Sequence, residues 1–179
     1  MYLALAEVQE YISTEDAEII DRVRVHLDKA VNFLPQLSNN HISNVYYHRA
    51  VINLYVNDFD KAVADVDKAI EKSEDNIPRY FYLRGLIFAC CGNFSQAVQD
   101  LSVAINLDEN FAKAFLERAK CLQMEGNPNE AFLDLQKYIT LRPEDPLIHK
   151  YAGFLLFQNC AYEDCLSAFS HGSELLSDV

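Results

Sequence analysis

The chain has 179 residues, half of them hydrophobic, and a formal net charge of −12. This negative balance argues against a nucleic-acid ligand and against an anionic membrane surface, because both are bound through clustered basic side chains. Only 5 Gly and 5 Pro are present, too few for the frequent turns of an all-β domain. The length fits one domain or one compact repeat stack, and long helices with short connections are expected.

The expected compartment is reducing and cytoplasmic. The sequence contains no run of 18 apolar residues, and its first residues lack the basic start of a signal peptide. The cysteines are odd in number and form no C-x-x-C pair: Cys90, Cys91, Cys121, Cys160 and Cys165. Disulfides are therefore not expected, and structural thiols are favoured over a redox pair at the two adjacent cysteines.

In chain order, residues 1–42 are predicted to form a divergent helix pair, Tyr2–Ile12 and roughly Ala17–Leu37. Three repeats follow without internal gaps, at 43–77, 78–111 and 112–145. Each opens its first helix with an aromatic residue, followed three positions later by Arg: Tyr46 and Arg49, Phe81 and Arg84, Phe115 and Arg118. A turn and a second helix with an early alanine come next: Ala62, Ala97 and Ala131. Residues 146–179 are predicted to be a degenerate fourth copy.

This pattern resembles the tetratricopeptide repeat, a helix–turn–helix unit of 34 residues with the consensus W-x₂-L-G-x₂-Y, A-x₃-F and a late proline. Pro143 matches that proline, whereas Glu74 and Glu109 stand in its place in the earlier repeats. The resemblance implies an all-α fold, a right-handed superhelical array of antiparallel helix pairs, and a single repeat domain over 1–179. One such pair cannot bury its apolar face alone, so neighbouring pairs must stack.

The physical reading of the residues agrees with this. Each predicted helix carries apolar residues at i, i+3, i+4 and i+7, the stripe of a half-buried helix. The three early alanines are predicted to lie buried where paired helices approach closely. Residues of a helix-capping type precede the second helices: Asp58, Asn93 and Asn127, the last followed by Pro128.

A second regularity pairs charges. Each of the three arginines is followed sixteen residues later by an aspartate: Asp65, Asp100 and Asp134. This offset in an antiparallel pair predicts ion pairs within a repeat, or with the matching Asp of an adjacent one. If partly exposed, each is worth ~0.2–1 kcal/mol.

The sequence contains no recognisable catalytic, cofactor or metal motif, so no enzyme activity and no cofactor are expected. The histidines are scattered and show no H-x₃-H or H-E-x-x-H spacing: His26, His41, His48, His149 and His171. No phosphate loop and no dinucleotide fingerprint occurs. With no catalytic, cofactor or metal motif present, the sequence favours a protein-binding surface as the functional feature.

The resemblance implies that first helices line a concave groove. Carried over position by position, the candidate partner-binding residues are Tyr47, Val51, Arg79, Tyr82, Leu86, Lys113, Leu116, Lys120, Lys150 and Phe154. Some groove positions can instead pack against a neighbouring repeat, and for Leu54, Ala89 and Phe157 both readings are open. Because the groove includes four basic residues on an acidic chain, a segment with apolar anchors and some acidic residues is the expected ligand.

The predicted function is a non-catalytic adaptor or scaffold module that holds a peptide or helix of another protein. One alternative is a co-chaperone-type domain that binds a heat-shock protein C-terminus through a carboxylate clamp, but only Lys113 fits the clamp pattern. Another is the regulatory repeat region of a larger enzyme. The chain stops soon after its last predicted helix, whereas terminal repeats normally carry a polar outer face, so a longer parent protein is expected. The identity of the partner and the oligomeric state are left open.

Overall fold

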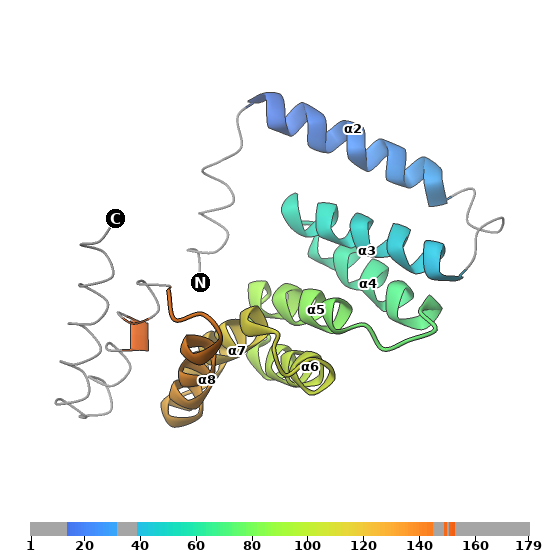
Figure 1. Cartoon of the computed structure of the whole chain (residues 1–179). Helices are drawn as coiled ribbons and strands as arrows, with labels where there is room; N and C mark the ends of the chain where they lie inside the picture. Colours follow the sequence, from blue (N-terminus) through green and yellow to red (C-terminus); the bar gives the residue numbers. More distant parts are fainter. Residues whose placement is uncertain (1–13, 32–38, 145–148, 150, 153–179) are drawn as a thin grey trace. The chain divides into compact units, whose positions relative to one another are not determined.

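The computed structural model describes residues 14–31, 39–144, 149 and 151–152, and all regular secondary structure in these ranges is helical (Figure 1). The helices are α2 (Thr14–Val31), α3 (Asn39–Tyr55), α4 (Phe59–Lys72), α5 (Pro78–Cys90), α6 (Phe94–Leu107), α7 (Ala112–Met124) and α8 (Pro128–Leu141). The chain divides into two compact units, 1–92 and 93–179, and each is described by itself. The predicted helix Tyr2–Ile12 and most of the fourth repeat lie outside the described residues, and the single domain over 1–179 stays a prediction.

The first unit is built around the hairpin of α3 and α4. These two helices pack along each other, α5 packs against α4, and α2 packs against α3. The buried core lies where α3, α4 and α5 meet, and its members are Ala50, Ala62, Val66, Ala69, Tyr80, Leu83 and Ile87. Since a single hairpin buries only one face of each helix, α5 supplies the apolar surface that α3 and α4 need.

The second unit repeats this arrangement with α6, α7 and α8. Here α7 packs against both α6 and α8. Its buried residues recur at helical spacing on the facing sides, among them Leu101, Ala104, Phe115, Ala119, Leu122 and Leu135. The predicted architecture of stacked, antiparallel helix pairs is confirmed in this unit and in the first.

The three early alanines of the second helices are completely buried. Ala62, Ala97 and Ala131 each have 0% of their surface exposed, which confirms the burial predicted from the sequence. A methyl group at these positions lets helix backbones approach closely, and a longer side chain would meet neighbours that cannot move away freely.

Helix α3 begins earlier than the repeat pattern predicts. The first repeat was expected to start at residue 43, with 1–42 as a separate helix pair, but the helix already begins at Asn39. No Gly or Pro interrupts the segment from Asn39 to Ser43, so nothing stops the helix from extending by one turn. The extra turn brings the carbonyl of Asn40 within reach of the Ser43 hydroxyl and the Asn44 amide, at 3.0 and 2.8 Å.

The turn after each first helix contains one residue in the left-handed region. These residues are Asn57 (φ 60°), Gly92 (φ 79°) and Gly126 (φ 81°), so the same backbone stop recurs once per repeat. Of the predicted N-caps, Asp58 accepts a bond from the Lys61 backbone N–H, whereas Asn93 and Asn127 make no side-chain cap bond. The aspartate is therefore the effective cap of the three.

Replacing Gly126 by Ala is expected to destabilise the protein by about 1 kcal/mol, because L-residues with a Cβ disfavour positive φ. A Cβ at this glycine would meet no atom within 4 Å, so the cost comes from the backbone alone. Urea unfolding measures it. The reciprocal change Asn57→Gly is the matched control and should leave stability unchanged or slightly raised. Equal stability of Gly126→Ala and wild type would contradict the account.

Candidate functional site

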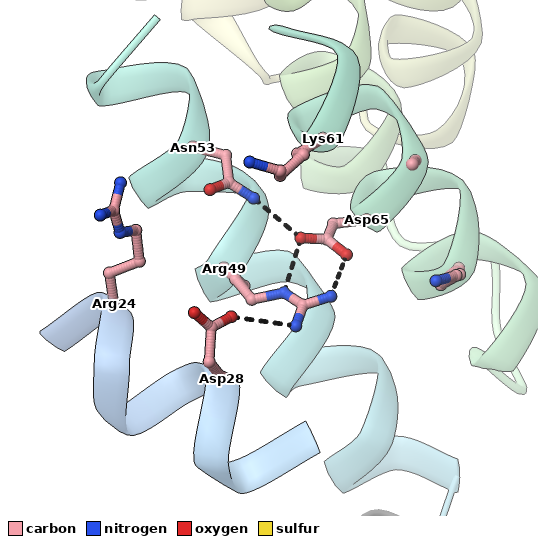
Figure 2. A pocket seen from close by; sticks show the side chains of 8 residues that line it. Arg24, Asp28, Arg49, Asn53, Lys61 and Asp65 are labelled. Carbon is pink, nitrogen blue, oxygen red and sulfur yellow. Dashed lines mark hydrogen bonds and ion pairs between the residues drawn. The ribbon is translucent and has the colours of Figure 1, made fainter. Parts of the chain in front are cut away.

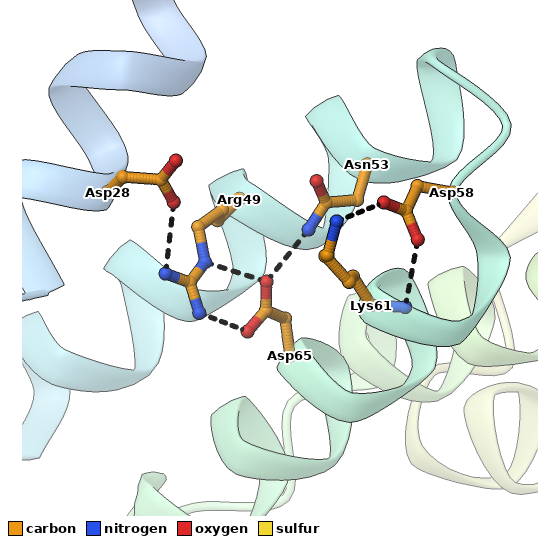
Figure 3. Close-up of polar contacts among 6 residues, drawn as sticks. All are labelled: Asp28, Arg49, Asn53, Asp58, Lys61 and Asp65. Carbon is orange, nitrogen blue, oxygen red and sulfur yellow. Dashed lines mark hydrogen bonds and ion pairs between the residues drawn. The ribbon is translucent and has the colours of Figure 1, made fainter.

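The predicted pair of Arg49 and Asp65 is present and forms the centre of a polar network (Figure 3). The guanidinium donates to both carboxylate oxygens, from Nε at 2.7 Å and from Nη2 at 2.6 Å. Its Nη1 donates to Asp28 of α2 at 3.2 Å, and Asn53 donates to Asp65 at 3.0 Å. The hydrogen bond to Asp65 is the main cause that raises the pKa of Arg49. The pair thus joins three helices through one arginine.

The second unit contains the same pair between α7 and α8. Arg118 donates to Asp134 from Nε at 2.7 Å and from Nη2 at 2.6 Å, and its Nη1 reaches Ser102 of α6 at 2.9 Å. Only 8% of the Asp134 side chain and 4% of the Asp65 side chain are exposed. These carboxylates are therefore more buried than the partly exposed pairs assumed from the sequence, and losing an arginine should cost more.

Arg84 makes a different contact. It donates to Asp67 of α4 at 2.6 Å, where 50% of the aspartate side chain is exposed. Its predicted partner Asp100 lies in the other unit, so that pair stays a prediction. The guanidinium also lies over the ring of Phe81, with 5.8 Å to the centroid. The aromatic residue three positions before each arginine supports the cation, since the same stacking occurs at Arg49 and Arg118.

Two predicted groove residues of the first unit, Tyr47 and Arg79, come together across successive first helices. The guanidinium of Arg79 lies over the rings of Tyr47 and Tyr80, at 5.1 and 5.4 Å from their centroids. Arg79 also donates to the Asn44 side-chain oxygen at 2.7 Å. Burial raises the pKa of Tyr47, while the charge of Arg79 opposes the rise. Asn44, Tyr47, Arg79 and Tyr80 are called the aromatic cluster below.

The other groove residues of the first unit are half-buried. Val51, like Tyr47, packs against the core. Both side chains therefore stabilise the fold, and both remain partly accessible to a ligand. Tyr82 and Leu86 of α5 are also half-buried. Leu54, for which both readings were open, packs against the core as well.

The second unit places its groove candidates on α7. Lys113 is exposed and Leu116 is half-buried. Lys120 pairs with Glu117 at 2.9 Å. Nearby, the Tyr151 hydroxyl donates to Gln123, and burial is the main cause that raises the pKa of Tyr151 to about 12. The last two candidates, Lys150 and Phe154, lie outside the residues whose side chains the structure describes.

The sequence reasoning missed a cleft between α2, α3 and α4, shown in Figure 2. It has a volume of about 490 Å³ and is lined by Arg24, Asp28, Arg49, Asn53, Lys61, Ala64, Asp65 and Lys68. We call it the first cleft. A second cleft of about 320 Å³ lies in the other unit and is lined by Val98, Ser102, Arg118, Leu122, Glu130, Leu133 and Asp134. The signal that could have found them is the shared Arg–Asp pair, which forms part of the wall of both.

Within the described residues, no group of three or more His, Cys, Asp or Glu side chains could hold a metal ion. Cys121 is buried, Cys90 is half-buried and Cys91 is exposed, and none of these three described cysteines forms a disulfide bond. Burial raises the pKa of Cys91, so its reactive thiolate form is disfavoured at neutral pH. No helix in the described part of the chain is long and apolar enough to cross a membrane.

Comparison with known proteins places this architecture among the tetratricopeptide-type repeat arrays. A crystal structure of MamA matches with a TM-score of 0.81 and 15% identity, covering 94% of this chain and 97% of that one. A MamA structure from Desulfovibrio magneticus RS-1 matches with a TM-score of 0.72 and 15% identity, covering 90% and 96%. YrrB, described as a TPR protein with an unusual peptide-binding site, matches with a TM-score of 0.73 and 19% identity, covering 92% and 81%.

No family model matches the chain, and neither does any curated protein. The likeness to solved structures, at these identities, concerns the fold. The chain therefore has the tetratricopeptide-repeat fold, as its sequence period predicted.

Proposed function

We propose that this protein is a non-catalytic adaptor that binds a peptide or helix of a partner protein along its first helices. The observation that carries the proposal is the aromatic cluster. Groove positions of two successive repeats, predicted separately from the sequence, contact each other there through Arg79 and Tyr47. A surface that is continuous from one repeat to the next is what an extended segment needs for several contacts at once.

The chemistry of the aromatic cluster suits a peptide. Tyr and Arg are the side chains most enriched at the energetic centres of protein interfaces. The planar guanidinium of Arg79 is already oriented by two rings and by the oxygen of Asn44, so less rotamer entropy is lost when a ligand binds. Its further N–H donors can bind a carboxylate or a backbone carbonyl of the ligand.

The description of YrrB names a peptide-binding site in that protein, which supports a peptide as the ligand of a chain with the same fold. The basic residues of the predicted groove would attract and orient an acidic ligand. Arg79 and Lys113 are exposed on an acidic chain, so they would steer an acidic segment towards the first helices. Reversing Lys113 and Lys120 to Glu should then slow association at low salt.

Replacing Arg79 by Ala is expected to weaken peptide binding about tenfold, the effect of removing an interface hot spot. Peptides are first selected on the whole wild-type chain from a random phage-displayed library. Their dissociation constants for wild type and variant are then measured by fluorescence anisotropy. The variant should keep its helices, because Arg79 is exposed and lies outside the core. Circular dichroism checks this.

Lys137→Ala is the matched control, because this lysine is exposed on the second helix α8 and is not a groove position. It should leave the affinity unchanged. If the selected peptides bind Arg79→Ala and Tyr82→Ala as tightly as wild type, the groove is not the binding surface. Capture from a cell extract with wild type and Arg79→Ala, followed by mass spectrometry, then identifies the partner as the protein lost from the variant.

A further inference from the structure

The two clefts occupy equivalent places in the two units. Each is formed by a helix hairpin and the helix that precedes it, α2 before α3 and α4 in the first unit and α6 before α7 and α8 in the second. The Arg–Asp pair lies in the wall of both clefts. The repeat therefore creates the cleft, and the residues around the pair decide its chemistry. The exchanges, from the first cleft to the second, are Arg24 to Val98, Asp28 to Ser102, Asn53 to Leu122, Lys61 to Glu130 and Ala64 to Leu133.

These exchanges reverse the charge of the cleft. Four basic and two acidic residues line the first cleft, whereas one basic and two acidic residues line the second, beside three apolar ones. The chain as a whole carries −12. A basic cleft is a local exception on such an acidic chain. The fold does not require this excess of basic residues, because the lining of the second cleft lacks it.

The basic side chains of the first cleft differ in their ion pairs with acidic residues. Arg49 is neutralised by Asp65 and Asp28. Lys61 is 73% exposed and pairs with Asp58, which is not a lining residue. In Figure 2, Arg24 from α2 and Lys61 from α4 lie on the two sides of Asn53. Basic side chains of α2 and α4 thus line one cleft.

On α3, the first cleft lies on a different face from the predicted groove. On α3, the groove position Tyr47 and the cleft position Arg49 are two residues apart, which at 3.6 residues per turn separates them by roughly half a turn. A ligand in the first cleft therefore does not compete with one at the aromatic cluster. The inference below is independent of the proposed function.

We propose that the first cleft binds an acidic segment of a partner protein, whose carboxylates pair with Arg24, Lys61 and Lys68. Charge complementarity selects an anionic ligand. The volume of about 490 Å³ is that of a small-ligand pocket, enough for a few side chains. A peptide also supplies backbone N–H donors, and the side-chain oxygen of Asn53 between the two cations can accept one. The amide nitrogen of Asn53 already donates to Asp65.

The test uses the whole chain and a fluorescein-labelled octaglutamate peptide at low salt. The variant Arg24→Val with Lys61→Glu gives the first cleft the residues that the chain itself has in the second. We expect wild type to bind the peptide and the variant to bind it about tenfold more weakly or worse. Amide shifts of the isotope-labelled protein should change around α2 and α4. Binding of equal strength by the variant, or shifts confined to α7, overturns the proposal.

Three controls make the outcome specific. Arg22→Val with Lys72→Glu changes the same residue types on the same helices outside the lining, and should leave binding unchanged; an equal loss would show a net-charge effect and overturn the proposal. Arg79→Ala should weaken binding much less than the cleft variant does, because octaglutamate lacks the apolar anchors expected of a groove ligand; an equal or larger loss at Arg79 would assign the peptide to the groove and overturn the proposal. Displacement by an equal concentration of inorganic phosphate would show a free-anion site instead of a peptide site.

Discussion

Replacing Arg118 by Met is expected to lower the free energy of unfolding by about 3 kcal/mol, because it leaves the Asp134 carboxylate buried without its bidentate partner. Arg118 donates to both oxygens of that carboxylate, at 2.6 and 2.7 Å, and only 8% of the Asp134 side chain is exposed. Met keeps much of the side-chain length, so the loss reports the charge pair more than the packing. Urea unfolding followed by circular dichroism measures it.

The equivalent arginine of the first unit, Arg49, provides a comparison for this result. Arg49→Met should cost less, about 2 kcal/mol, because Asn53 still donates to Asp65. At the equivalent position of the second unit stands Leu122, which has no donor. The double variant Arg118→Met with Asp134→Leu should recover much of the loss, since no unpaired charge remains buried. A single variant as stable as wild type would show that the pair does not stabilise the fold.

Replacing Ala62 by Leu is expected to destabilise the first unit by about 2 kcal/mol, through overpacking of the core between α3, α4 and α5. Ala62 is 0% exposed and belongs to the core cluster. The core has no room for three further carbon atoms unless the helices move apart. Thermal and urea unfolding of wild type and variant measure the difference.

Ala64→Leu is the matched control on the same helix. Ala64 is exposed, and the equivalent residue of the second unit is already a leucine, Leu133, with 63% of its surface exposed. This change should alter stability by less than about 0.5 kcal/mol. Equal losses at both positions would mean that the register of α4 differs from the one described, and a neutral Ala62→Leu would mean that the seam is loosely packed.

Much of the fold and a part of the candidate site could be predicted from the sequence. The recurrence of Arg, turn and alanine at a fixed offset specified the helix pairs and their register. It also predicted the partners of Arg49 and Arg118 correctly, because both members of each pair belong to one hairpin whose geometry a short turn restricts. Buried alanines followed from the same offset, since close helix approach leaves room only for small side chains.

The tertiary structure alone decided what lies between successive repeats. The sequence could not show that Asp28 and Ser102 complete the two arginine networks, or that Arg79 stacks on Tyr47. Nor could it show that one cleft is basic and its counterpart partly apolar. These contacts depend on how neighbouring helix pairs pack and on which rotamers their long side chains adopt. A repeat period fixes spacing along the chain, whereas the packing of its faces sets which side chains from different repeats meet.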